Sequence, residues 1–480
     1  MKLEEILKVL RYEKIIGSTN INVTRLCDNS KKAKKDDLFF CYVGVSCDSH
    51  DYVYEAEERG AIAIVCERQI SNCRLTQIIV KDGRAAVAKV ARAFYGNADE
   101  KLKIIAVTGT NGKTTTTYML NAIYSEANKK TAIIGTLGIR YGEKFISPEL
   151  TTPDPIFLHK IFADMVNCGV EYVFMEVSAH AIYFNKTDKI TFEMAVFTNC
   201  TQDHLDFFGS MREYSDCKKS LFSKQKCKKA IINSDDKTGV EIINEYEKAI
   251  TYGINNPADV FAVNISENVN GTAFLINAFD ELYDIKLRFP AIFNVYNAMA
   301  AITCARLSGI SLAICAQGLY KLKNVSGRLE KVVNYNGADV FVDFAHTPDG
   351  LQKSLQTLKK LCKGKLYLVF GCGGNRDKSK RPLMGEVAVK YADFCVVTSD
   401  NPRYEDPYDI ISNVEEGMKN YGKKYVTVTD RETAIDYALR ILNKNDILLV
   451  AGKGGENYQE IMGIKHSFND NTVIKKLIGR

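Results

Sequence analysis

The chain has 480 residues, of which 46% are hydrophobic and 25% charged, and its formal net charge is +6. These values are typical of a globular protein too long for one hydrophobic core, so we expect about two to four domains. The modest charge gives no reason to expect a nucleic-acid partner, and no apolar run is long enough to predict a membrane span. The 14 cysteines include no C-x-x-C pair, which favours reduced thiols and a cytoplasmic location.

The first part of the chain mixes short apolar runs with one helical pattern. The N-terminus is charged and amphipathic, unlike a signal peptide. Apolar runs predict strands at 38–43, 61–67 and 76–82. Alanine, valine and phenylalanine recur along one side of 82–95, which predicts a helix. The polar segment GNADEKLK that follows marks a joint, so we expect a first α/β domain at residues 1–98.

A glycine-rich turn follows the apolar run IIAV within Lys103–Tyr118, KIIAVTGTNGKTTTTY. A buried strand, such a turn and a helix opening on threonines form a phosphate-binding device, because backbone N–H groups and the helix dipole face the anion. Lys113 would reach the terminal phosphates, and Thr114 would offer its hydroxyl to Mg²⁺. The common spacing requires glycine where this chain has Val107, so the loop is a variant that begins at Gly109.

Strand and helix patterns alternate through residues 99–327, which predicts a central domain built on a mostly parallel sheet. Its expected strands are 103–107, 131–136, 171–177, 194–200 and 228–236. Glu176 follows an apolar run at the carboxyl end of one of these strands. In a sheet that carries a phosphate loop, this position favours a Mg²⁺ ligand.

The last part, residues 328–480, contains four apolar strands that each end in a polar loop, which predicts a doubly wound, Rossmann-like domain. Ligands bind such sheets outside the carboxyl ends of the strands, so these loops should form one ligand-facing rim. Its candidate residues are Asp343, His346, Arg376, Asn401, Arg403, Lys453 and Glu456. The cluster GCGGNR alone is weak evidence for a dinucleotide, and nicotinamide binding is not favoured.

Two short motifs resemble those of regulatory GTPases but stand in the wrong order. Asn185–Asp188 reads NKTD, the guanine-recognition pattern, and Asp206–Gly209 reads DFFG, the metal and γ-phosphate pattern. In GTPases the second pattern precedes the first, and NKxD follows a buried strand. Here the order is reversed and NKTD follows an irregular stretch, so a GTPase is not favoured.

A series of motifs along the whole chain closely resembles the Mur ligases. In order they are TGTNGKTTTT (108–117), TTPD (151–154), MEVSAHA (175–181), TNCTQDHLDFF (198–208), YSDCKKSLF (214–222), SGRLE (326–330), VDFAHTPDGL (342–351), FGCGGNRDKSKRPLMG (370–385), SDNPRYEDP (399–407) and AGKGGENYQ (451–459). The resemblance implies an ATP-dependent amide ligase with an N-terminal UDP-binding domain, a central ATPase domain and a C-terminal amino-acid-binding domain. The shortened phosphate loop is the form that this family shares with folylpolyglutamate synthases.

The resemblance also implies residue roles in ATP and metal binding. ATP would contact Gly109, Thr110, Asn111, Gly112, Lys113, Thr114, Thr115, Asn297, Arg328 and Asp343. Thr114 and Glu176 would hold one Mg²⁺, and His204 a second. The lysine of Y-x-x-x-K is carbamylated in this family, which corresponds to Lys218; from the sequence alone, Lys218 and Lys219 would be a solvated pair on a helix. The catalytic residues implied are therefore Lys113, Glu176, His204 and Lys218.

The implied second substrate is a UDP-N-acetylmuramoyl dipeptide. It would contact Ser30, Val45, Ser46, Cys47, Thr151, Thr152, Ser178 and Lys186. The chain departs from the common family pattern here, with Leu150, Ala179, Phe184 and Lys186 at positions where other residues are usual. We expect a monomer with no nucleic-acid partner.

The implied third substrate is meso-diaminopimelate, which would contact Arg376, Asp400, Asn401, Pro402, Arg403, Gly452 and Glu456. Diaminopimelate has a second carboxylate that lysine lacks, and a planar guanidinium binds a carboxylate through two parallel hydrogen bonds. Arg403 and Arg376 could both serve it, and Glu456 could accept from the distal ammonium. Lanthionine, L-lysine, a folylpolyglutamate synthase-like activity and a non-catalytic nucleotide-binding scaffold are the alternatives.

Overall fold

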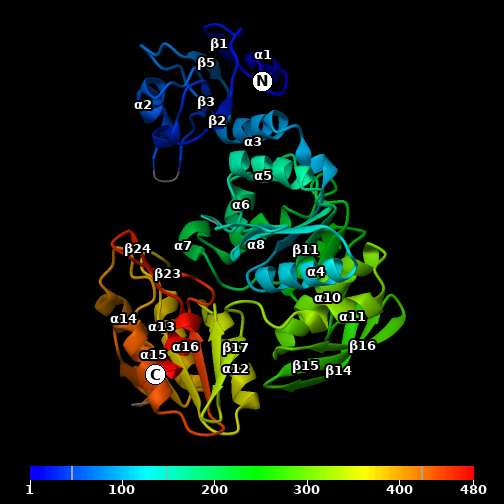
Figure 1. Ribbon diagram of the computed structural model, residues 1–480, viewed down its shortest axis with the longest axis vertical. Helices are drawn as coiled ribbons and strands as arrows, with labels where there is room; N and C mark the ends of the chain where they lie inside the picture. Colours follow the sequence, from blue (N-terminus) through cyan, green and yellow to red (C-terminus); the bar gives the residue numbers. More distant parts are fainter. Residues whose placement is uncertain (45–46, 148, 423–424, 480) are drawn as a thin grey trace. The chain divides into compact units, whose positions relative to one another are not determined.

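The computed structural model describes residues 1–44, 47–147, 149–422 and 425–479 (Figure 1). The chain forms two compact units, and each unit draws on several segments of the sequence. The first unit contains residues 1–106, 130–194 and 220–228, and the second contains 107–129, 195–219 and 229–480. Among the described residues, the structure has no helix with the length and hydrophobicity needed to cross a bilayer.

A five-stranded sheet lies at the N-terminal end of the first unit, in the order β1-β5-β4-β3-β2. Its strands are β1 (Lys14–Ile16), β2 (Arg25–Cys27), β3 (Asp37–Phe40), β4 (Ala63–Cys66) and β5 (Thr76–Ile79). All pairs are parallel except β1 with β5. The helices are α1 (Leu3–Leu7), α2 (Val53–Glu58) and α3 (Gly83–Phe94). Two apolar clusters bury the residues of the sheet. One contains residues of α1 and α3, and the other contains residues of α2. This burial explains why the central strands are continuous apolar runs.

The rest of the first unit carries the candidate residues of the central region. Strand β10 (Tyr172–Glu176) pairs in parallel with β7 (Thr131–Gly135), from which β8 (Gly138–Tyr141) and β9 (Lys144–Ile146) continue as an antiparallel meander. Two helices follow, α5 (Pro155–Asn167) and α6 (Ala179–Tyr183). Ser178 caps α6 by accepting a hydrogen bond from the backbone N–H of Ala181.

The second unit begins at the end of β6 (Lys103–Thr108), which leads into α4 (Lys113–Glu126). Its first sheet runs in parallel through β11 (Met194–Phe197), β12 (Ala230–Asn233), β13 (Ile250–Gly253) and β14 (Val260–Asn268). Helices α7 (Leu205–Phe208), α8 (Met211–Lys219), α9 (Lys237–Glu245), α10 (Ile292–Leu307) and α11 (Leu312–Lys321) accompany it. Most residues of α10 are fully buried, so this helix is part of the core.

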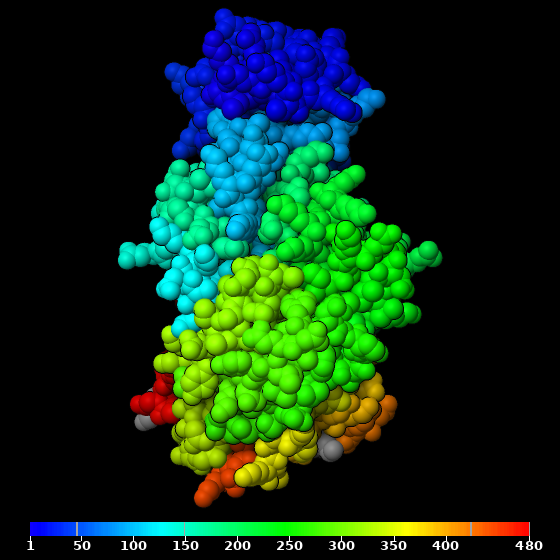
Figure 2. Space-filling model, turned by 90° about the vertical axis from the view of Figure 1, so that its right-hand side faces the viewer, coloured from blue at the N-terminus to red at the C-terminus, as the bar shows by residue number. Residues whose placement is uncertain are grey.

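Two antiparallel strands in this region extend the sheet and were not among the strands expected from the sequence. β15 (Gly271–Ala278) and β16 (Glu281–Leu287) extend β14 in antiparallel hairpins, with turns at Asn270 and at Phe279–Asp280. Their segment is drawn in green in Figure 2, where its side chains form part of the molecular surface. Leu282, at the outer strand, is 58% exposed. The alternating exposure of these strands is typical of an antiparallel sheet with one solvated face.

The C-terminal part of the second unit is a six-stranded sheet in the order β17-β18-β22-β19-β20-β21. Its strands are β17 (Glu330–Tyr335), β18 (Ala338–Asp343), β19 (Leu366–Phe370), β20 (Phe394–Val397), β21 (Tyr425–Thr427) and β22 (Ile447–Ala451). All pair in parallel except β17 with β18. The carboxyl ends of the parallel strands therefore share one edge, as expected of a doubly wound sheet.

Helices cover both faces of this sheet. One apolar cluster contains residues of α12 (Pro348–Leu361), α13 (Lys380–Tyr391) and α14 (Pro407–Glu416). The other contains residues of α15 (Arg431–Arg440) and α16 (Asp470–Ile478). A short antiparallel hairpin, β23 (Tyr458–Ile461) and β24 (Ile464–Ser467), follows β22. The predicted doubly wound fold is confirmed.

A buried ion pair between α15 and α16 gives a test of this packing. Arg431 donates from Nε and Nη2 to the two oxygens of Asp470 at 2.8 and 2.7 Å, and both side chains are fully buried. Removing one partner leaves the other charge buried, so Arg431→Leu should lower the free energy of unfolding by about 3–5 kcal/mol. Urea denaturation measures the loss.

The matched control lies on the same helix. Arg440 pairs with Asp436 at 2.8 Å, but its side chain is 74% exposed. Water and salt screen such a pair, so Arg440→Leu should cost less than about 1 kcal/mol. Equal losses from the two substitutions would contradict the assignment of Arg431 as a buried structural cation.

Candidate active site

The turn between β6 and α4 lies tightly against neighbouring backbone. A Cβ at Gly109 would lie 1.9 Å from Thr198 Oγ1, and a Cβ at Gly112 would lie 2.4 Å from Asn297 Oδ1. Both glycines also have positive φ, at 143° and 90°. Only glycine fits these positions, and the turn ends with Lys113 as the first residue of α4. The predicted strand, turn and helix are therefore present.

Hydrogen bonds anchor this phosphate loop to the segment after β11. Thr110 Oγ1 donates to Thr201 O at 3.1 Å and lies 3.2 Å from the hydroxyl of Tyr214 on α8. The N–H of Asn111 donates to Asn199 Oδ1 at 2.9 Å. Lys113 Nζ donates to the carbonyls of Gly109 and Thr110 at 2.8 and 2.9 Å. The loop is thus held in one shape, with its lysine folded over it.

Arg328 reaches the first turn of α4 from a distant segment and is itself packed against the residues that end β18. Arg328 donates from Nη2 to Thr114 Oγ1 at 2.9 Å, and its guanidinium lies 4.5 Å from the ring centroid of Phe344. The carboxylate of Asp343 accepts from the N–H groups of Leu329 and Ala345 at 2.5 and 2.7 Å. Burial raises the pKa of Asp343 to about 6 although Arg328 opposes this.

Asn297 and Thr115 complete the group of predicted ATP contacts in this unit. Asn297, on α10, accepts from Thr116 Oγ1 at 3.3 Å and is the residue against which Gly112 packs. Thr115 is buried in the first turn of α4. The ten residues predicted to contact ATP therefore come from the phosphate loop, α4, α10 and the start of the C-terminal sheet.

Lys218 on α8 is buried, with 1% of its surface exposed. Its ammonium nitrogen lies 4.3 Å from the ring centroid of Tyr214. Burial, followed by the charge of Lys113, lowers the pKa of Lys218 to about 7. The interpretation of Lys218 as part of a solvated pair was wrong, because its side chain is buried, whereas the neighbouring Lys219 pairs with the carboxylates of Asp216 and Glu241.

His204 lies in a loop rather than directly at the end of a strand. Strand β11 ends at Phe197, and His204 instead precedes the short helix α7 with a left-handed backbone, φ 54°. Its Nε2 lies 3.3 Å from Asp203 Oδ2, and its N–H donates to the other oxygen of Asp203. The predicted strand extended to residue 200, whereas β11 ends at Phe197. The polar loop TNCTQD therefore separates the strand from His204.

In the first unit, Glu176 is the last residue of β10, as predicted, and is 1% exposed. Its carboxylate accepts from the N–H and the hydroxyl of Thr136 at 2.9 and 3.0 Å. A Cβ at Gly135 would lie 2.1 Å from Glu176 Oε1, so glycine makes room for this carboxylate. Within the described residues, no group of three histidine, cysteine or acidic side chains is arranged to hold a metal ion by itself.

The predicted muropeptide residues of the first unit form a chain of contacts that begins at Glu176. Thr152 Oγ1 donates to the carbonyl of Glu176 and accepts from the N–H of Ser178. Thr151 Oγ1 lies 3.1 Å from Thr136 Oγ1. Lys186 pairs with Asp154 at 2.7 Å. The contacts of Glu176 with Thr136 and Thr152, and of these with Thr151 and Ser178, place four polar side chains beside the end of β10.

The remaining muropeptide candidates belong to the N-terminal sheet region. Ser30 donates to Glu55 Oε2 at 2.6 Å, and Cys47 is exposed. Val45 and Ser46 lie outside the described residues. Phe184, one of the departures from the family pattern, packs on the guanidinium of Arg84 with a centroid distance of 4.7 Å.

The carboxyl edge of the C-terminal sheet brings two arginines together at Gly373. A Cβ on Gly373 would lie 3.0 Å from Arg403 Nη1 and 3.8 Å from Arg376 Cγ, while one on Gly374 would lie 1.9 Å from the carbonyl of Pro402. The glycines of GCGG therefore allow the loop that carries Arg403 to pack against the loop that carries Arg376.

A polar cluster stands beside these arginines. Lys453 Nζ donates to Asn401 Oδ1 at 2.8 Å and to Glu456 Oε2 at 3.1 Å, and Asn401 Nδ2 donates to the same Glu456 oxygen. Asp400 Oδ1 accepts from the N–H of Asn401, and Asp400 Oδ2 is buried near Gly452 without a hydrogen-bond partner among the described residues. Lys453, a residue of the predicted rim, is buried, and its pairing with Glu456 was not predicted.

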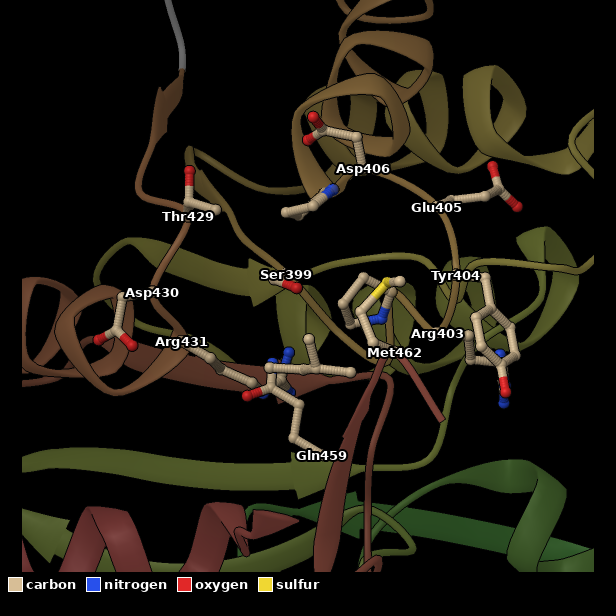
Figure 3. A pocket seen from close by; sticks show the side chains of 13 residues that line it. Ser399, Arg403, Tyr404, Glu405, Asp406, Thr429, Asp430, Arg431, Gln459 and Met462 are labelled. Carbon is tan, nitrogen blue, oxygen red and sulfur yellow. The ribbon is translucent and has the colours of Figure 1, made fainter. Parts of the chain in front are cut away.

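A cavity of about 610 Å³ lies beside the loop that contains Arg403 (Figure 3). Arg403 and Tyr404 come from the loop after β20, Thr429 and Asp430 from the loop after β21, and Met462 from the turn of the β23–β24 hairpin. The cavity thus opens at the carboxyl edge of the sheet, where doubly wound folds bind ligands.

The fold and the phosphate loop together define a P-loop nucleotide-binding protein, and comparison with known proteins identifies its family. Residues 107–305 match the Mur ligase middle domain, and residues 327–454 match the glutamate ligase domain of Mur ligases. The chain belongs to the Mur ligase family, whose members are ATP-dependent ligases.

Full-length relatives and solved structures agree with this assignment. The UDP-N-acetylmuramoyl-L-alanyl-D-glutamate--2,6-diaminopimelate ligase of Caldanaerobacter subterraneus subsp. tengcongensis is 44% identical, covering 100% of this chain and 99% of the relative. A ligase of the same name, numbered 1, from Clostridium acetobutylicum is 41% identical, covering 100% of this chain and 99% of the relative. A solved structure of a protein with that name has a TM-score of 0.71 and 30% identity, covering 100% and 99%. MurF from Acinetobacter baumannii, with a TM-score of 0.69 and 19% identity, shares the fold.

The close packing of the phosphate loop predicts the effect of adding one methyl group. Gly112→Ala should weaken ATP binding more than tenfold, because the Cβ would meet Asn297 Oδ1 and the backbone has φ 90°. Isothermal titration with ATP measures the affinity. Gly96→Ala is the control, since Gly96 also has a positive φ, 73°, but nothing lies within 4 Å of its added Cβ. Equal loss of ATP affinity in both variants would contradict the role of the packed turn.

Proposed function

We propose that this protein joins meso-2,6-diaminopimelate to UDP-N-acetylmuramoyl-L-alanyl-D-glutamate and converts ATP to ADP and phosphate. The observation that carries the choice of amino acid is the pair Arg376 and Arg403 at Gly373, beside the cluster of Asn401, Lys453 and Glu456. The names of the full-length relatives support the same substrates.

Diaminopimelate carries a carboxylate and an ammonium at each end. The guanidinium of Arg403 and that of Arg376 supply charged, planar donors for the distal carboxylate. Glu456, with the carbonyl of Gly452, supplies acceptors for the distal ammonium, and Asp400 Oδ2 is a further buried acceptor close by. L-Lysine would leave the two arginines without a carboxylate, whereas lanthionine would satisfy the same groups.

The reaction requires activation of a carboxylate, which is a poor electrophile. A carboxylate oxygen of the D-glutamyl residue attacks the γ-phosphorus of ATP, and the bond to the leaving ADP oxygen breaks. The free amine of the amino acid then attacks the carbonyl carbon of the acyl phosphate. Phosphate leaves with the electron pair of the C–O bond, and the nitrogen loses one proton as the amide forms. Such a transfer depends on positioning and charge neutralisation.

Lys113 and the N–H groups of the loop from Gly109 to Thr115 hold the phosphates in this proposal, with Asn297, Arg328 and Asp343 around the nucleoside. Thr114, Glu176, His204 and the carbamate of Lys218 would hold two Mg²⁺ ions, which neutralise developing charge on the phosphoryl oxygens when bound. Oxygen donors from a hydroxyl and carboxylates suit this hard cation. The buried carboxylate of Glu176 at a strand end supports this donor set.

The muropeptide binds, in this proposal, along Ser30, Val45, Ser46 and Cys47, with its peptide arm near Thr151, Thr152, Ser178 and Lys186. The domain boundaries at residues 98 and 327, a monomeric state and a cytoplasmic location stay predictions.

Phosphate release tests the proposed reaction. With ATP, Mg²⁺ and UDP-N-acetylmuramoyl-L-alanyl-D-glutamate, the purified protein should release phosphate when meso-diaminopimelate is added, and mass spectrometry should show the tripeptide product. L-Lysine and lanthionine are the comparison amino acids. Faster release with L-lysine would overturn the substrate, and no release with any of the three would overturn the reaction.

Carbamylation of Lys218 has its own test. Only a neutral amine attacks CO₂, and a pKa of about 7 leaves roughly half of Lys218 neutral at pH 7, far more than an ordinary lysine. In ¹³C-bicarbonate the wild-type protein should give a carbamate NMR signal that fades as the pH falls below 7. Lys218→Ala should lack the signal and lose at least about 100-fold in kcat, with partial rescue by a short carboxylate.

Lys219→Ala is the matched control for this experiment. Lys219 is the next residue on α8, and its ion pairs with Asp216 and Glu241 raise its pKa. Its removal should leave both the carbamate signal and kcat unchanged. Wild-type kcat in Lys218→Ala would refute a catalytic role for this lysine.

A further inference from the structure

The β23–β24 hairpin holds the backbone of Arg403 in an uncommon conformation. Arg403 has φ 52°, in the left-handed region that a residue with a Cβ disfavours. Its N–H donates to the carbonyl of Glu460 at 3.0 Å, and its own carbonyl accepts from the N–H of Met462 at 2.7 Å. Arg403 thereby forms a bridge to Ile461, between these two residues. Figure 3 shows Arg403 and Met462 lining the same cavity.

Glu460, whose carbonyl accepts from the N–H of Arg403, also contacts the side chain of Arg403. Glu460 Oε2 lies 3.2 Å from Arg403 Nε, and the two side chains are 21% and 18% exposed. On the other side, Arg403 Nη1 donates to the carbonyl of Gly374 at 2.7 Å. A guanidinium held at Nε and at Nη1 has its plane fixed. Among the contacts of Arg403 with described residues, none uses Nη2.

We propose that Glu460 is a positioning residue that fixes the guanidinium of Arg403 for the second carboxylate of the diamino acid. The inference rests on the proposed function of Arg403. Arginine has a long stem with many rotamers, and a carboxylate is recognised through two parallel N–H groups only if the guanidinium plane is correctly oriented. Glu460 orients this plane before the substrate arrives, so less conformational freedom is lost on binding.

The arrangement predicts that the effect of substituting Glu460 on the KM for diaminopimelate depends on the presence of Arg403. A purely structural residue would not show this dependence. Glu460→Ala should raise the KM for meso-diaminopimelate about tenfold and leave the KM for ATP within twofold, because loss of the ion pair with Glu460 releases the guanidinium of Arg403. Glu460→Gln keeps the length and polarity of the side chain but removes its charge, and it should raise the KM for diaminopimelate only about threefold. In an Arg403→Ala background, Glu460→Ala should change the KM for diaminopimelate less than twofold.

The experiment is a double-mutant cycle with initial rates of phosphate release, and thermal unfolding verifies that each variant is folded. Ile464→Ala, an exposed substitution on the same hairpin, should leave every KM unchanged. An equal rise caused by Glu460→Ala in both backgrounds, or an equal rise for ATP, overturns the inference. Failure of the proposed function is distinct, because wild-type protein would then fail to use diaminopimelate.

Discussion

The close backbone packing of the phosphate loop is the constraint on which the rest of the site in the second unit depends. Gly109 and Gly112 lie so near Thr198 and Asn297 that no side chain fits, and hydrogen bonds tie the loop to the segment after β11. Since α4 begins directly after this turn, its first residues inherit a fixed position. Arg328, which lies more than 200 residues later in the chain, donates a hydrogen bond to Thr114 in this first turn.

The C-terminal sheet uses the same device for a different purpose. Gly373 and Gly374 permit two loops from neighbouring parallel strands to touch, and the contact places Arg403 and Arg376 beside each other. Neither glycine offers a side chain to a ligand, yet each controls where a guanidinium lies. In both places, recognition of an anion depends first on the absence of a Cβ and only then on the charged residue.

Much of this arrangement could be predicted from the sequence, because it follows local patterns. Glu176 after a buried apolar run and Lys113 after a glycine-rich turn lie where the pattern predicts. The antiparallel strands β15 and β16 were missed, because the alternating apolar residues of this segment were not distinguished from the strand–helix pattern on either side of it. The burial of Lys218 could not be read from its helix. Tyr214 lies one turn earlier on the same helix, but the charge of Lys113 comes from a distant segment that is near Lys218 only in the folded chain.

Contacts between distant loops were also beyond sequence patterns. The pairing of Lys453 with Glu456 is local, but its link to Asn401 depends on the order of strands in the sheet. Glu460 meets Arg403 only because the hairpin after β22 folds back on the loop after β20. Strand order is set by packing of the whole sheet, and no short motif encodes it.

Burial shifts two ionisable groups of the second unit toward neutrality. Lys218 has a lowered pKa and Asp343 a raised one, each chiefly because burial disfavours the charged form. The free-energy cost of removing these two groups from water is met during folding, before any substrate binds. Charged ligands then enter surroundings of low dielectric, where each interaction with a fixed dipole or ion is stronger than in water.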